Sequence, residues 1–198
     1  MLDRAKVFTV LLIIVGIVLL SVTCPTKRNN NSQLEKSILL QFEDNIDHYT
    51  FVAESLWNHS DYFEWLHNET GSSSIGKPFS NHQTCGLLNT NLKAYFSQDE
   101  WIMYEKFIKQ HEPYSITYYP LYFSSEGEIC SLPVIEFLYI EKQTESLFTL
   151  SSLYYVCMPN EPEEKVESTI EYFGYGRDNI PQKFNDSWYY HIEHESIP

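Results

Sequence analysis

An uninterrupted apolar run near the N-terminus is the most pronounced pattern along the chain. Residues 7–23 contain no charged side chain, and a basic, Asn-rich stretch at 27–31 ends the run. In an α-helix a segment of this length extends about 26 Å, somewhat less than a hydrocarbon core but within the range of spanning helices. The pattern predicts a short cytoplasmic segment at 1–6, a transmembrane signal anchor at 7–24 and a polar linker at 25–33.

The charges beside the apolar run set the expected orientation. Arg4 and Lys6 precede the run and Lys27 and Arg28 follow it, so the two sides are nearly balanced. A very short basic region ahead of an apolar run is typical of signal anchors. We therefore expect a single-pass protein of the cell membrane with an extracytoplasmic C-terminal domain. Two other interpretations stay open: cleavage of the run as a signal peptide, and lipid attachment at Cys24.

Beyond the linker, apolar positions recur at spacings of three and four, which is the period of an amphipathic helix. This spacing predicts one helix over 34–56 and a shorter helix around 62–66. The stretch 68–78 is rich in Gly and Ser and is predicted to be a loop.

A further helix is expected to begin at Ser97. Ser97 and Glu100 have the spacing of a capping box, in which each side chain accepts a hydrogen bond from a backbone N–H at the helix start. Pro113 ends this helix, because a proline ring does not fit a helix interior.

After Pro113 the period changes from helical to extended. Runs rich in Tyr, Phe, Ile, Val and Thr are separated by polar turns, which is typical of antiparallel strands. The predicted strands are 114–123, 128–141, 146–158 and 167–175, followed by a hairpin of 180–184 and 188–192. This order predicts an α+β fold for the domain at 34–198, with helices packed on one face of an antiparallel meander sheet.

The chain is strongly acidic, with 27 Asp and Glu residues against 13 Lys and Arg and a net charge of −14. Four of the basic residues but only one acidic residue precede residue 29, so the exported domain is more acidic than the whole chain. A field of this sign repels phosphate backbones, and we expect no nucleic-acid partner. Basic protein or peptide partners would be attracted.

Cys130 and Cys157 are the favoured disulfide pair. If strands 128–141 and 146–158 form a regular hairpin, opposed residue numbers sum to 287 and the two cysteines face each other. A register slip of one residue would place them on opposite faces. Pairing of Cys85 with either cysteine, or buried free thiols, are the alternatives.

The sequence contains none of the common catalytic or metal-binding signatures. His-Glu-x-x-His, Cys-x-x-Cys and Gly-x-Ser-x-Gly are all absent, and we predict no metal and no cofactor. A thiol enzyme would need Cys85 together with His82, His59 or His67. Sequence neighbourhood alone is weak support for such a pair.

Three tyrosines are candidates for a recognition surface. Tyr118, Tyr119 and Tyr122 lie near the end of the first predicted strand, and aromatic side chains are enriched at protein interfaces. The leading hypothesis is a non-enzymatic, membrane-tethered binding or assembly module with a protein or peptide partner. The alternatives are an envelope hydrolase or thiol enzyme, and a ligand-sensing domain that acts through a partner subunit.

Overall fold

The computed structural model describes residues 27–77, 86–123, 129–142, 147–158, 160–174 and 180–196. The chain divides into two compact units, Met1–Asp44 and Asn45–Pro198. The predicted anchor at 7–24 lies outside the described residues. Among the residues that are described, no helix is both long enough and apolar enough to cross a bilayer.

In the first unit the described element is the helix α2 (Lys27–Glu43), which starts within the stretch predicted as a linker. The single helix predicted over 34–56 is wrong, because α2 ends at Glu43 and α3 (Ile46–Asn58) begins after a turn at Asp44 and Asn45. Asp and Asn favour such breaks, since their short polar side chains compete with helical hydrogen bonding.

The second unit begins with α3 and continues through short elements to a capped helix. These elements are α4 (Ser60–Thr70), β1 (Ser74–Gly76), α5 (Thr90–Tyr95) and α6 (Gln98–His111). The helix predicted around 62–66 is α4, and β1 lies inside the stretch predicted as a loop.

The predicted capping box of α6 is confirmed. The Ser97 side chain accepts a hydrogen bond from the Glu100 N–H at 3.3 Å, and the Glu100 carboxylate accepts one from the Ser97 N–H at 2.9 Å. At the other end Glu112 takes a left-handed conformation with φ 45°, and Pro113 follows. Local sequence signals therefore fix both ends of this helix.

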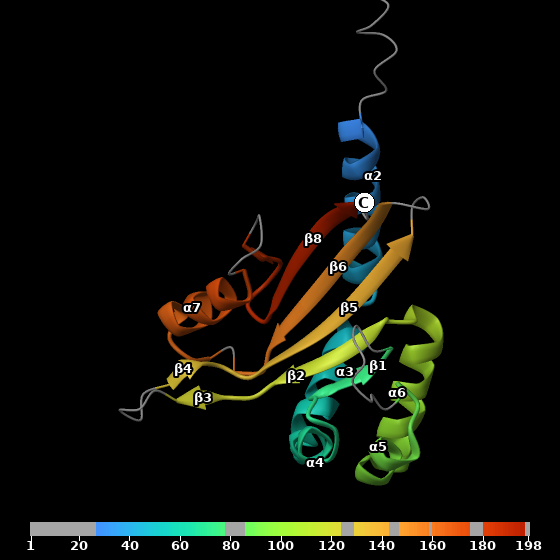
Figure 1. The fold of residues 1–198 in the computed structure, drawn as a ribbon, viewed down its shortest axis with the longest axis vertical. Coiled ribbons are helices and arrows are strands. Elements are labelled where there is room, and N and C mark those ends of the chain that lie inside the picture. Colours follow the sequence, from blue (N-terminus) through green and yellow to red (C-terminus); the bar gives the residue numbers. More distant parts are fainter. Residues whose placement is uncertain are drawn as a thin grey trace, which may run out of the picture. The chain divides into compact units, whose positions relative to one another are not determined.

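An antiparallel sheet of the order β1-β2-β5-β6-β8-β7 forms the centre of the second unit (Figure 1). Its remaining strands are β2 (Ser115–Tyr119), β5 (Val134–Lys142), β6 (Leu147–Val156), β7 (Gln182–Lys183) and β8 (Trp188–Ser196). A separate two-stranded sheet pairs β3 (Tyr122–Phe123) with β4 (Ile129–Ser131). The predicted α+β class, the meander and the final hairpin are confirmed, and the strand predicted over 128–141 is divided between β4 and β5.

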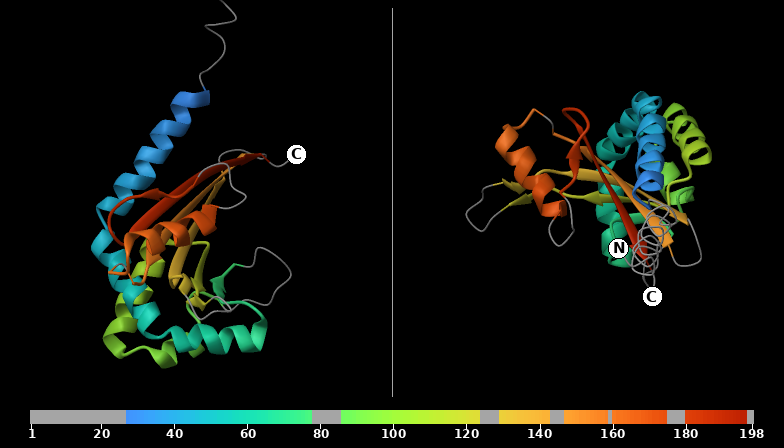
Figure 2. Two further views of the ribbon diagram at one scale, coloured as in Figure 1. Left: turned by 90° about the vertical axis from the view of Figure 1, so that its left-hand side faces the viewer. Right: turned by 90° about the horizontal axis from the view of Figure 1, so that it is seen from above.

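The predicted strand 167–175 is wrong, because this stretch belongs to the helix α7 (Glu163–Gly174). Its inward residues Val166 and Ile170 pack in a cluster with Val134, Tyr154 and Tyr189 of the sheet. The helices α3 and α6 contact the opposite face of the sheet (Figure 2), where Tyr49 and Phe107 meet Phe137. Helices therefore cover both faces of the sheet rather than one.

The face of the sheet opposite α7 carries an aromatic core. Tyr49 of α3 and Phe107 of α6 both meet Phe137 of β5, with ring centroids 5.7 and 5.5 Å apart. Trp188 of β8 lies 5.9 Å from Phe137 and donates a hydrogen bond from its indole N–H to the Thr50 hydroxyl at 3.0 Å. Large buried aromatic rings of this kind contribute much of a core's stabilisation.

His111, the last residue of α6, is buried within this aromatic core. Its ring lies 4.8 Å from Phe107, 4.9 Å from Tyr49 and 5.7 Å from His48. Neither ring nitrogen has a hydrogen-bond partner among the described residues. Burial, assisted by His48, lowers the pKa of His111 from 6.5 to about 4. The folded domain therefore holds this imidazole in its neutral form near pH 7.

Candidate functional site

A groove runs between α7 and the β7–β8 hairpin. It consists of two hollows of about 450 and 300 Å³ that share Glu163, Lys183 and Tyr189 in their walls. The described lining residues all belong to the second unit. We call this feature the α7 groove.

Apolar side chains form the floor of the α7 groove. Val166 and Ile170 lie on the inner side of α7, one turn apart, and they pack in one cluster with Tyr189 of β8. The three side chains are almost fully buried in the domain core. The floor is therefore rigid, because it is part of the packed core.

Carboxylates line the helical side of the groove. Glu163, Glu167 and Glu171 are four residues apart, which places them along one side of α7, with one turn between neighbours. Glu161 and Asp186 add two further carboxylates at one end of the groove. Lys183 is the one basic side chain among the described lining residues.

The opposite wall is held in place by the turn of the β7–β8 hairpin. The Asn185 side-chain oxygen accepts hydrogen bonds from the N–H groups of Ser187 and Trp188, both at 2.9 Å. Next to this turn, the Lys183 ammonium lies 3.4 Å from the Asp186 carboxylate. Ile180 is 56% exposed beside the groove, so the wall also offers an uncovered apolar side chain.

The field in the α7 groove is negative. The pKa of the Tyr189 hydroxyl is raised chiefly by burial, and the charges of Glu167, Glu163 and Asp186 raise it further while Lys183 opposes them. The pKa of the Lys183 ammonium is raised, first by its hydrogen bond to Asp186. The contributions of the groove carboxylates to both pKa values have the sign that favours added positive charge.

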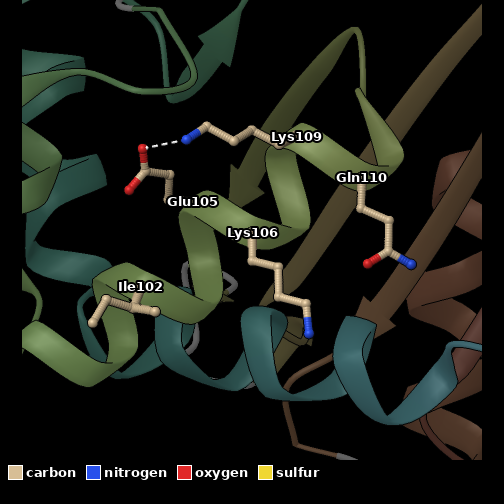
Figure 3. A pocket seen from close by; sticks show the side chains of 5 residues that line it. All are labelled: Ile102, Glu105, Lys106, Lys109 and Gln110. Atoms are coloured by element: carbon tan, nitrogen blue, oxygen red, sulfur yellow. Dashed lines mark hydrogen bonds and ion pairs between the residues drawn. The ribbon is translucent and has the colours of Figure 1, made fainter.

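A second hollow, of about 400 Å³, lies on the outer side of α6 (Figure 3). Its described lining residues are Ile102, Glu105, Lys106, Lys109 and Gln110. Lys109 pairs with Glu105 at 2.7 Å, whereas Lys106 points away from that pair in Figure 3. This surface is open and is basic where most of the chain is acidic.

The three tyrosines predicted to form a recognition surface do not share one. Tyr118 and Tyr119 are adjacent in β2 and project to opposite faces. The Tyr118 ring packs against Phe63 of α4, with centroids 5.4 Å apart, and the Tyr119 ring meets Phe173 of α7 edge to face at 4.7 Å. Both are half-buried, and Tyr122 is 51% exposed. Only Tyr122 is therefore available at the surface.

Tyr119 has an internal role in the structure. Its hydroxyl donates to the buried Glu136 carboxylate at 2.8 Å, and the Ser152 hydroxyl donates to the same carboxylate at 2.7 Å. Two donors compensate part of the cost of burying this carboxylate.

The register predicted for the Cys130–Cys157 disulfide is wrong. In the β5–β6 pair Val134 faces Val156, so opposed residue numbers sum to 290 rather than 287. Cys157 is a buried free thiol, and burial raises its pKa far above the ordinary value. The side chain of Cys130 lies outside the described residues. The predicted register therefore gives no support to the disulfide. The pairing of Cys130 with Cys157 stays a prediction.

The residues considered for a thiol enzyme are not brought together by the described structure. Cys85 and His82 lie outside the described residues. His59 lies 3.4 Å from the Glu100 carboxylate, and His67 is exposed on α4. Within the described part of the chain there is no group of three His, Cys, Asp or Glu residues arranged to hold a metal ion.

The α7 groove was missed at the sequence level, although a signal for it was present. Val166, Ile170 and Phe173 have helical spacing, and Glu163 and Glu164 follow Pro162 as acidic residues do at a helix start. A comparison with known proteins adds no further assignment, since the chain matches no protein-family model, no curated protein and no solved structure. The fold and groove define an acidic α+β domain with a groove of mixed carboxylate and apolar lining beside α7.

Proposed function

We propose that this protein is a non-enzymatic binding module, tethered to the cell membrane through residues 7–24, whose α7 groove binds a basic segment of a partner protein. The domain would lie on the extracytoplasmic side. The α7 groove carries this proposal: five carboxylates and one lysine surround an apolar floor.

The chemistry of the groove sets the character of the partner segment. Carboxylates one helical turn apart can each accept a charge-assisted hydrogen bond from a Lys or Arg side chain. The exposed Ile180 offers apolar contact to a Leu, Ile or Met residue between those cations, above the almost fully buried floor of Ile170 and Tyr189. The expected segment therefore combines two or three basic residues with at least one large apolar residue.

The proposed membrane anchor would compensate for a low affinity of the α7 groove for its partner. A tethered domain meets its partner at a high effective concentration when the partner is also at the membrane surface. Modest affinity per site is then sufficient for assembly, and exposed charge pairs of this kind are individually weak.

The test uses the full-length protein in lipid nanodiscs and a fluorescent peptide of Lys and Leu residues. Binding is measured by anisotropy for the parent and for a variant with Glu167→Gln and Glu171→Gln. The matched control removes two exposed carboxylates from α4 through Asp61→Asn and Glu69→Gln. We expect the groove variant to bind about 10-fold more weakly and the control to change less than about twofold, since each exposed pair contributes roughly 0.2–1 kcal/mol.

A salt series and a peptide with Glu in place of Lys complete the experiment. Affinity should fall as salt rises, and the acidic peptide should not bind. Equal loss of binding in the groove variant and the α4 control would show that overall charge is responsible, and the proposed site would be wrong.

A further inference from the structure

The helices α6 and α7 lie on opposite faces of the same sheet (Figure 2), so the hollow lined by α6 and the α7 groove are on opposite sides of it as well. Val134, Tyr154 and Tyr189 point toward α7, whereas Phe137 and Trp188 point toward α3 and α6. One domain therefore cannot place its own α6 surface in its own groove. Any contact between the two surfaces must join two copies.

The α6 surface has the composition that the α7 groove favours. Ile102, Lys106 and Lys109 lie at positions i, i+4 and i+7 of α6, which is one side of a helix. Ile102 is 52% exposed, and the side chain of Lys109 is 65% exposed. The surface thus presents one large apolar side chain followed by two cations.

The spacing of charges on the two helices is also compatible. Lys106 and Lys109 are about one helical turn apart on α6. Glu163 and Glu167 are also about one turn apart, on the α7 side of the groove. Ile102 and Ile180 are 52% and 56% exposed, so each surface also offers an uncovered apolar side chain to the other. Lys109 lies 2.7 Å from Glu105 within its own chain, so in the contact it would share its charge between Glu105 and a groove carboxylate. Lys106 points away from that pair (Figure 3) and supplies the main cation.

We propose that the α6 surface of one copy occupies the α7 groove of a second copy, so that membrane-tethered domains assemble head to tail. This inference rests on the proposed function, because it names the occupant of the same groove. A contact between two different surfaces is heterologous, and it leaves a free groove at one end and a free α6 surface at the other. Copies tethered in one membrane can extend such a contact into a ring or a row.

The high net charge limits where this assembly forms. A chain with net charge −14 repels its copies at long range, and that repulsion is screened beyond about 8 Å at physiological ionic strength. Tethering raises the local concentration of copies in the membrane plane. Assembly is therefore expected among reconstituted full-length chains and is expected to weaken at low salt, where repulsion reaches further.

Cross-linking between two distinguishable chains tests the pairing directly. One full-length chain carries Ile102→Cys and the other Ile180→Cys, each with a different tag, and both are reconstituted in the same liposomes. A short bismaleimide should cross-link the mixed pair at least fivefold more than either chain with itself. The parental chain, with its four native cysteines, sets the background.

Charge exchange supplies the control for folding. Lys106→Glu with Lys109→Glu should abolish the mixed cross-link, and so should Glu163→Lys with Glu167→Lys. Combining one chain of each kind should restore it, which a misfolded variant could not do. Preferential cross-linking of Ile102→Cys chains to each other, or no recovery in the combined sample, would overturn the head-to-tail contact.

The two proposals fail in different ways. If the Lys and Leu peptide binds the α7 groove but no mixed cross-link forms, the second-copy assignment is wrong and the proposed function stands. If the groove carboxylates affect neither peptide binding nor cross-linking, both proposals are wrong.

Discussion

Acidification from pH 7 to pH 5 is expected to destabilise the domain through the single side chain of His111. This imidazole is only 7% exposed and lies among Phe107, Tyr49 and His48. Its pKa is lowered from 6.5 to about 4, chiefly by burial, with a smaller contribution from His48. The folded state therefore disfavours the protonated ring that the unfolded chain accepts readily.

The direction and size of the effect follow from proton linkage. Between pH 6.5 and 4 the unfolded chain binds a proton that the folded domain does not, so stability falls as pH falls through this window. For these two pKa values the loss between pH 7 and pH 5 is roughly 2 kcal/mol, at 1.36 kcal/mol for each unit of pKa difference. Above pH 6.5 this contribution to stability is fully present.

The measurement is urea unfolding of the full-length protein in detergent at pH 7, 6 and 5, for the parent and for His111→Phe. Phe keeps the ring in an aromatic site where neither nitrogen has a described partner, so at pH 7 the variant should be at least as stable as the parent. Between pH 7 and pH 5 the free energy of unfolding of the variant should fall by about 2 kcal/mol less than that of the parent. Carboxylates contribute equally to both chains and cancel in the difference.

His67→Gln is the matched control, because His67 is exposed on α4. This variant should follow the parent at all three pH values. Parallel pH profiles for the parent and His111→Phe would refute the argument that His111 is held neutral by burial.

Three further predictions concern local geometry. Gly76→Ala should destabilise the domain by more than about 2 kcal/mol in thermal unfolding, because φ of Gly76 is 117° and an added Cβ would lie 2.5 Å from the Tyr114 carbonyl oxygen. Gly71→Ala should cost only about 1 kcal/mol, because φ of Gly71 is 75° and no atom lies near the added Cβ. Ser97→Ala should cost about 1 kcal/mol through loss of the capping box, and Ser97→Asp should retain most of that stability in the same assay. Cys157 should resist iodoacetamide at pH 8 in the folded protein and react after unfolding, as followed by peptide mass, because burial raises its pKa.

The helix α6 shows what could be predicted from sequence, because its signals are local. The capping box joins atoms only three residues apart, and Pro113 acts on the backbone next to it. Such interactions form in the same way wherever the helix packs. The prediction of both ends of α6 was therefore correct.

The helix α7 shows where residue preferences misled. Residues 167–175 are rich in Thr, Ile, Tyr and Phe, which favour strands, yet Val166 and Ile170 bury one helical face on the sheet. Burial against Tyr154 and Tyr189 outweighs the weak local preference. The α7 groove was invisible for the same reason, since it exists only when this stretch is a helix beside the β7–β8 hairpin.

The sequence by itself determined the α+β class, the meander, the final hairpin, the start of α6 and the acidic character of the domain. It also carries the apolar run at 7–23 on which the proposed anchor rests. Only the tertiary structure decided the register of β5 and β6, in which paired residue numbers sum to 290, and the helix on the second face of the sheet. It also decided that Glu163, Lys183 and Tyr189 line one groove. The physical reason is distance along the chain: caps, turns and hydrophobic periods act over a few residues, whereas register and grooves depend on packing between segments that are far apart in sequence.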